Sequence, residues 1–94
     1  GKVLARNLRQ KAFKDYSMGN VKKAVENFEE MASIYKSIDF APGITAAFFS
    51  LGLLHEEQNE IGLAIEFFRK VLKISPGHIQ AQERLFDLEK KNNR

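Results

Sequence analysis

The stretch that decides the fold is residues 45–78, TAAFFSLGLLHEEQNEIGLAIEFFRKVLKISPGH. Its first half is apolar on nearly every side, which indicates a helix with neighbours on most faces. After a polar break around Asn59, residues 61–74 place apolar side chains at the i, i+3, i+4, i+7 spacing of an amphipathic helix. Ser75-Pro76-Gly77 then breaks this period. We therefore expect helices over about 44–58 and over 61–74.

Helical periodicity recurs in the rest of the chain, over about residues 3–18, 20–38 and from 79 until the polar end at 89–94. Asn20 is a good N-cap whose side chain can accept a first-turn N–H. Ala41-Pro42-Gly43 is expected to separate the second helix from the third. The fold class predicted is all-α with five helices. Their apolar stripes include Leu4, Leu8, Ala12 and Tyr16 in the first, Val21, Ala24, Val25, Phe28, Met31, Ala32, Tyr35 and Ile38 in the second, and Ile79, Ala81, Leu85, Phe86 and Leu88 in the fifth.

The chain also resembles itself, which points to a repeat architecture. Pro42 and Pro76 are 34 residues apart (76 − 42), whereas Phe28 and Phe68 are 40 apart (68 − 28), as are Ala24 and Ala64. Both offsets hold if the first repeat carries six extra residues (40 − 34) before its proline. Such an insertion should lengthen the second helix by about one and a half turns.

Residues 45–78 resemble the tetratricopeptide repeat family through Phe48-x-x-Leu51-Gly52-x-x-His55, Ala64-x-x-x-Phe68 and Pro76. The first repeat keeps Gly19, Ala24 and Phe28 of this pattern and, after the insertion, Pro42, but has Ala12 and Asp15 where the family has Gly and Tyr. The resemblance implies a right-handed superhelical stack of antiparallel helix pairs in one domain, 1–94. Its parts would be repeat one over about 5–44, repeat two over 45–78 and a capping helix over 79–94.

Composition sets the limits on function. The 94 residues have a net charge of +3, 44% hydrophobic residues and no cysteine, which suits one globular domain and excludes disulfides and thiolate chemistry. The charge is uneven, because residues 1–23 sum to +6 (7 − 1) and residues 24–94 to −3 (8 − 11). Such a basic helix is usually a solvated face, and otherwise binds phosphate or an acidic partner. We expect no membrane segment and a cytoplasmic location.

The sequence offers little catalytic chemistry. His55 and His78 lie in different elements, neither at a metal-ligand spacing; His55 replaces a packing residue of the family, and His78 can cap a helix. Adjacent carboxylates such as Glu56 and Glu57 point in different directions on a helix, so we expect both to face solvent. No glycine-rich loop could hold a phosphate. We therefore predict a protein that is not an enzyme and uses no metal or cofactor.

The resemblance implies binding of another protein, because the first helix of each hairpin lines a concave groove in this family. The groove would hold a peptide or an amphipathic helix, unless the insertion, the last helix or a missing repeat covers it. A chaperone C-terminal tail is not expected, since only two cations, Arg9 and Arg84, occupy the family's tail-binding positions. Self-association within a longer array and weak nucleic-acid binding by the first helix are the alternatives. The predicted groove residues are Arg6, Arg9, Phe13, Tyr16, Phe49, Ser50, Leu53, Glu56 and Arg84.

Overall fold

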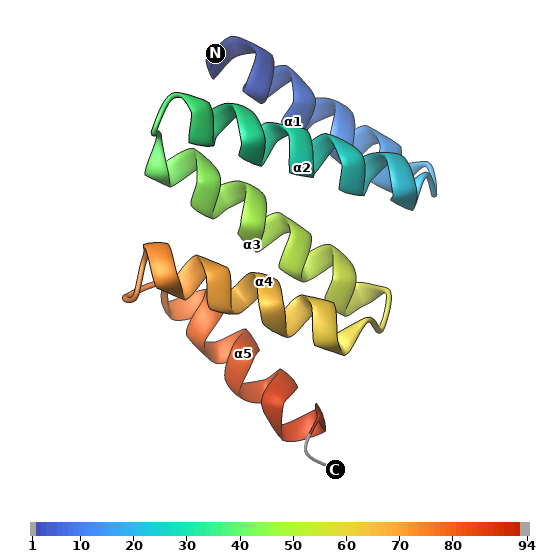
Figure 1. Ribbon diagram of the computed structural model, residues 1–94. Coiled ribbons are helices and arrows are strands. Elements are labelled where there is room, and N and C mark those ends of the chain that lie inside the picture. Colours follow the sequence, from blue (N-terminus) through green and yellow to red (C-terminus); the bar gives the residue numbers. More distant parts are fainter. Residues whose placement is uncertain (1, 93–94) are drawn as a thin grey trace. The chain divides into compact units, whose positions relative to one another are not determined.

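The computed structural model describes residues 2–92, and within this range the chain forms five α-helices and no strand (Figure 1). The helices are α1 (Lys2–Ser17), α2 (Val21–Ser37), α3 (Ala41–Glu57), α4 (Ile61–Ile74) and α5 (Ile79–Asn92). The prediction of an all-α helical repeat fold is confirmed.

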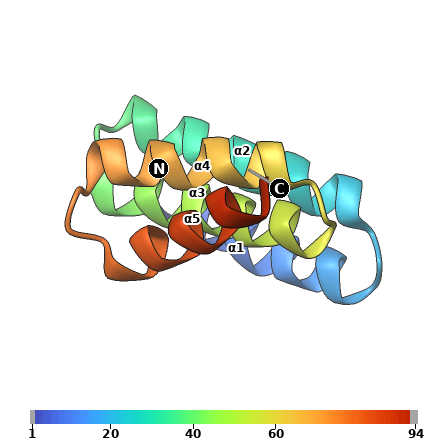
Figure 2. The same ribbon diagram turned by 90° about the horizontal axis from the view of Figure 1, so that it is seen from below.

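The chain divides into two compact units, Gly1–Ala47 and Phe48–Arg94, and the boundary between them falls inside α3. The first unit contains the hairpin of α1 and α2 with the start of α3. The second contains the rest of α3, α4 and α5, and its two connections lie at opposite ends of α4 (Figures 1 and 2). Each unit therefore holds one complete antiparallel helix pair.

Three of the four helix connections use the same backbone motif. Each has one residue in the left-handed region, namely Gly19 (φ 83°), Asp39 (φ 54°) and Asn59 (φ 61°). The following residue donates its N–H to a carbonyl five positions earlier, as in a Schellman motif. These bonds are Asn20 to Asp15 at 2.8 Å, Phe40 to Tyr35 at 2.9 Å and Glu60 to His55 at 2.8 Å.

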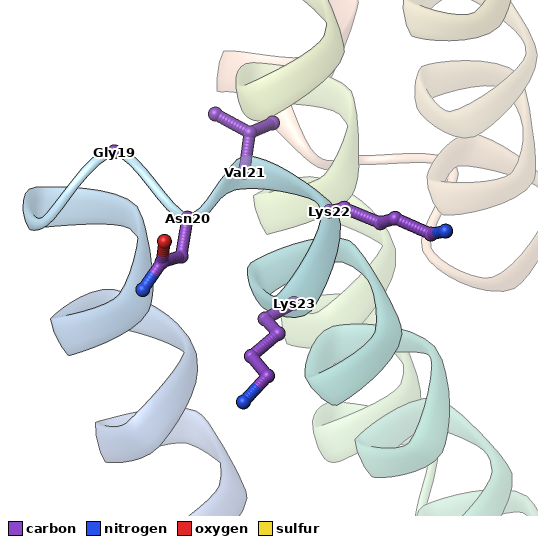
Figure 3. A pocket seen from close by; sticks show the side chains of 5 residues that line it. All are labelled: Gly19, Asn20, Val21, Lys22 and Lys23. Carbon is purple, nitrogen blue, oxygen red and sulfur yellow. The ribbon is translucent and has the colours of Figure 1, made fainter.

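Asn20 precedes α2 as predicted, but its side chain makes no capping hydrogen bond. Figure 3 shows the side chain pointing toward α1, away from the first turn of α2. Both backbone groups of Asn20 already have hydrogen-bond partners. Its N–H closes the Schellman motif, and its carbonyl accepts the N–H of Ala24 at 3.0 Å. The prediction of a side-chain cap is therefore wrong, and the backbone forms the turn.

The third helix begins three residues earlier than expected, at Ala41 instead of Ile44. Pro42 lies in the first turn of α3, where a missing N–H costs nothing because first-turn N–H groups have no partner within the helix. Gly43 is helical as well, and a methyl group there would overlap the ring of Tyr35. Proline breaks a helix only when it lies in the helix interior, and Pro42 lies in the first turn. The prediction that Pro42 separates the second helix from the third is therefore wrong.

The hairpins of the two units bury largely the same positions. At an offset of 40 residues, five buried side chains of the first hairpin have a buried counterpart in the second, whereas the counterparts of Ala5 and Ala32 are the half-buried Thr45 and Leu72. The buried pairs are Leu8 and Phe48, Ala12 and Gly52, Ala24 and Ala64, Phe28 and Phe68, and Met31 and Val71. The helix α2 has 17 residues and α4 has 14, so α2 is longer by three residues (17 − 14) and not by the one and a half turns expected.

Four residues of the predicted apolar stripes lie in solvent. Leu4, Ile79 and Phe86 are exposed, and Ile38 is exposed beyond the end of α2. An i, i+4 row drifts by about 40° per step, because each residue turns the helix by about 100°, so it leaves the core side within two turns. Ala5 is buried in place of Leu4 for this reason.

We predict that Gly52→Ala destabilises the fold. A Cβ at residue 52 would lie 2.7 Å from the ring of Phe68, which is fully buried and has no room to move. Overpacking of this kind costs about 1–3 kcal/mol, more than the gain of at most about 1 kcal/mol that Ala has over Gly in a helix. The free energy of unfolding in urea measures the difference.

The matched control is Gly62→Ala in α4, where a Cβ would meet nothing within 4 Å. Helix propensity alone acts there, so this variant should be more stable by about 0.5–1 kcal/mol. If both substitutions stabilise the protein equally, the close approach of Phe68 to Gly52 is not a constraint.

Candidate functional site

The predicted groove residues of the second unit lie on α3 and α5. The ring of Phe49 lies 5.5 Å from that of Phe68 and 4.9 Å from that of His78, measured between centroids. Phe49 and Ser50 are both half-buried. Phe49 therefore covers the fully buried Phe68 as well as contributing to the surface, and its side chain supports the fold.

Leu53, one turn further along α3, is more exposed, at 39%. It lines an open hollow of about 320 Å³ together with Glu56, Glu57 and Arg84. Three of these four side chains were predicted as groove residues. The structure brings Leu53 and Glu56 of α3 together with Arg84 of α5, which is 28 residues beyond Glu56 in the sequence (84 − 56). Glu57 was missed, because it was interpreted only as a solvent-facing charge.

Glu56 and Arg84 form an ion pair at this hollow. The Nε of Arg84 donates to Oε1 of Glu56 at 2.9 Å, and an Nη of Arg84 donates to Oε2. Such a bidentate pair fixes both side chains more firmly than a single contact. Glu56 is half-buried by it, so the expectation that this carboxylate faces solvent is wrong. Arg84 already has a carboxylate partner, so its guanidinium is not free to bind an acidic ligand.

The other predicted groove residues lie on α1 in the first unit. Phe13 is exposed on one side and packs edge-on against Phe28, with centroids 5.3 Å apart and an angle of 82°. The guanidinium carbon of Arg9 lies 5.6 Å from the centre of the Phe13 ring. Arg6 is exposed and Tyr16 half-buried. This face of α1 is therefore basic and aromatic; nucleic-acid binding by it stays a prediction.

Both histidines make contacts that support the fold. His55 is buried, stacks on Phe67 with ring planes 6° apart, and its Nδ1 lies 2.9 Å from a carboxylate oxygen of Glu60. His78 caps α5, because its Nδ1 accepts the N–H of Ala81 at 3.1 Å. Over residues 2–92, no three histidine or acidic side chains gather as metal ligands. In the same range, each helix is too short or too polar to cross a lipid bilayer.

We predict that the ion pair of Glu56 and Arg84 couples α3 to α5. A double-mutant cycle with Glu56→Gln and Arg84→Gln should give a coupling of about 0.5–1 kcal/mol, since the pair is bidentate but partly solvated. The measurement is urea unfolding of the wild type, both single variants and the double variant, and the coupling should fall in high salt.

Arg69 and Glu89 provide the matched control. Their side chains join α4 to α5 through one hydrogen bond of 2.7 Å, and both are well exposed. The same cycle at this pair should give a smaller coupling, about 0.3 kcal/mol. Equal couplings at the two pairs would mean that burial and bidentate geometry add nothing at Glu56.

Comparison with known proteins bears on the fold. A family model described as tetratricopeptide repeat matches residues 45–78. Among solved structures, the chain is similar to one titled "First TPR of Spaghetti (RPAP3) bound to HSP90 peptide SRMEEVD", with a TM-score of 0.51 and 14% sequence identity, over 100% of this chain and 97% of that chain. At 14% identity, this similarity is evidence for the fold alone. No curated protein matches the sequence of this chain.

The matched residues are the ones that carry the repeat pattern in the sequence, and they form α3, α4 and the turn into α5. The small residue at 52 and the buried Phe68 are in contact distance as the pattern implies. Residues 45–78 therefore match a tetratricopeptide repeat, as the sequence predicted, within a helical repeat fold.

Proposed function

We propose that the protein is a non-catalytic interaction module whose α3–α5 surface binds an amphipathic helix or an extended peptide of another protein. The observation that carries the proposal is Leu53, an apolar side chain left exposed at the edge of a hollow lined by charged groups. An apolar anchor with polar groups around it is the usual composition of a recognition site. The match to a tetratricopeptide repeat supports a protein-interaction role in general.

The chemistry of the hollow suggests how a partner is held. An apolar side chain of the partner would cover Leu53, which removes its exposed surface from water at about 25 cal/mol per Å². The ion pair of Glu56 and Arg84 leaves carboxylate and guanidinium edges that can bond a peptide backbone or an amide side chain. On α1, Arg6, Arg9, Phe13 and Tyr16 are proposed as a second contact area of basic and aromatic character.

We predict that Leu53→Glu abolishes partner binding without unfolding the protein. Peptides would be selected from a random library on the wild-type chain and then titrated against the variants by calorimetry. Placing a carboxylate where an apolar side chain is buried costs several kcal/mol, so affinity should fall at least about a hundredfold.

The matched control is Leu63→Glu, because Leu63 is 42% exposed on α4 and does not line the hollow. It changes the same residue type at nearly the same exposure, so it should leave affinity unchanged. Selected peptides that bind Leu53→Glu as tightly as the wild type would remove this surface from the proposal.

The peptide of the similar structure, SRMEEVD, is a natural second ligand to test, and we expect it to bind poorly. In the family, the tail of cytosolic heat-shock chaperones is held by lysine, arginine and asparagine side chains. Here Ser50 and Gln80 occupy two of those positions, and the guanidinium of Arg84 is paired with Glu56. Each missing charge-assisted hydrogen bond costs about 1.5–3 kcal/mol.

We predict no saturable binding of SRMEEVD to the wild-type chain, and saturable binding when Ser50→Asn and Gln80→Lys are combined. Fluorescence anisotropy of the labelled peptide measures both. The same peptide with an amidated C-terminus is the control, since it lacks the terminal carboxylate. Tight wild-type binding would show that Ser50 and Gln80 are no obstacle to the tail.

A further inference from the structure

The outer side of α5 carries two large apolar side chains that the fold leaves uncovered. Ile79 is 67% exposed and Phe86 is 63% exposed. Seven residues are close to two turns of an α-helix, so both side chains lie on one face, opposite the buried Ala81 and Leu88. An apolar face of this kind usually marks a contact with another molecule.

The polar groups beside Phe86 are mainly acidic. Gln82, Glu83, Phe86 and Asp87 line an open hollow of about 430 Å³. Within residues 2–92, neither Glu83 nor Asp87 has an ion-pair partner. The cation of this face is Lys90, whose ammonium lies 5.2 Å from the centre of the Phe86 ring. The surface therefore suits a partner that is apolar and basic.

The outer side of α1 has this complementary chemistry. Val3 is 69% exposed and Leu4 is 52% exposed. Lys11 and Lys14 are exposed as well; Val3 and Lys14 face away from the buried residues of α1, and Leu4 and Lys11 lie on the adjoining flank. The one carboxylate of α1 belongs to Asp15, and it accepts a hydrogen bond of 2.8 Å from an amide of α2. This face thus offers apolar and cationic groups with no competing free acid.

We propose that the outer face of α5 in one copy of the chain binds the outer face of α1 in a second copy. The first turn of α1 covers Ile79, and Lys11, seven residues further along α1, then lies beside Phe86 and pairs with Glu83 or Asp87. The overall charge distribution supports this occupant, because residues 1–23 sum to +6 (7 − 1) and residues 24–94 to −3 (8 − 11) in the same chain. Opposite potentials favour encounter and fix the register of such a contact.

The geometry of this contact determines how many copies associate and how strongly. The two faces differ, so a pair of copies joined by one such contact still has one free α5 face and one free α1 face, and association continues beyond a dimer. A contact between two helix faces lies at the small end of protein interfaces, below about 1,200 Å². Association is therefore weak, concentration-dependent and sensitive to salt, because the charged groups are exposed.

Sedimentation velocity of the full chain over a concentration series, at low and high salt, tests the proposal. The weight-average sedimentation coefficient should rise with concentration, and less so at high salt. Lys11→Glu with Lys14→Glu, and separately Glu83→Lys with Asp87→Lys, should each keep the chain monomeric. An equimolar mixture of the two variants should restore association, because the reversed α1 face then meets a reversed α5 face.

Three further variants separate this contact from other effects. Lys22→Glu with Lys23→Glu makes the same charge change as the α1 variant, but on α2, and should associate like the wild type apart from the altered net charge. Phe86→Ser changes no charge and should weaken association. Leu53→Glu should leave association intact, so that this contact and the partner site on α3 fail independently. Circular dichroism checks that each variant is folded.

A wild-type chain that sediments as a monomer at every concentration would overturn the proposal. Association that persists in both charge-reversal variants would also overturn it, because another face would then form the contact. A mixture of the two folded variants that stays monomeric would do the same.

Discussion

The second unit depends on how closely α3 can approach α4 at one position. Residue 52 has no side chain, and a methyl group there would lie 2.7 Å from the ring of Phe68. That buried ring is covered by Phe49, which in turn packs on His78. His78 then accepts the N–H of Ala81 and so begins α5. One absent side chain thus allows a run of contacts through α3, α4 and the start of α5.

The first unit reaches the same arrangement with different side chains. Ala12 takes the place of the glycine, and Phe28 takes that of Phe68, both at an offset of 40 residues. The aromatic ring that packs on Phe28 is Phe13, 36 residues before Phe49 (49 − 13) and so one helical turn away from the equivalent position. The repeat therefore keeps the positions of the buried small residue and the buried ring, while the side chain that covers the ring can move by a turn.

Sequence periodicity predicted the five helices and their buried aromatic and small residues, because the 3.6-residue period reports which side of a helix avoids water. The predictions were wrong at the ends of helices, where periodicity carries no information. Pro42 acts as a breaker in a helix interior but not in a first turn, and backbone bonds replaced the expected cap at Asn20. At the site, α3 and α5 were predicted, but the pairing of Glu56 with Arg84 joins residues distant in sequence, which a local pattern does not describe.

The remaining question is which apolar residues of an inner helix serve binding and which serve the fold. Phe49 and Leu53 are one turn apart on α3 and look alike in the sequence. Phe49 covers a buried ring, so removing it would alter folding and binding together. Leu53 is exposed and lines a hollow with charged neighbours, so it can change with little cost to the core. Packing therefore assigns the two roles, and Leu53 is the side chain through which recognition can be measured on its own.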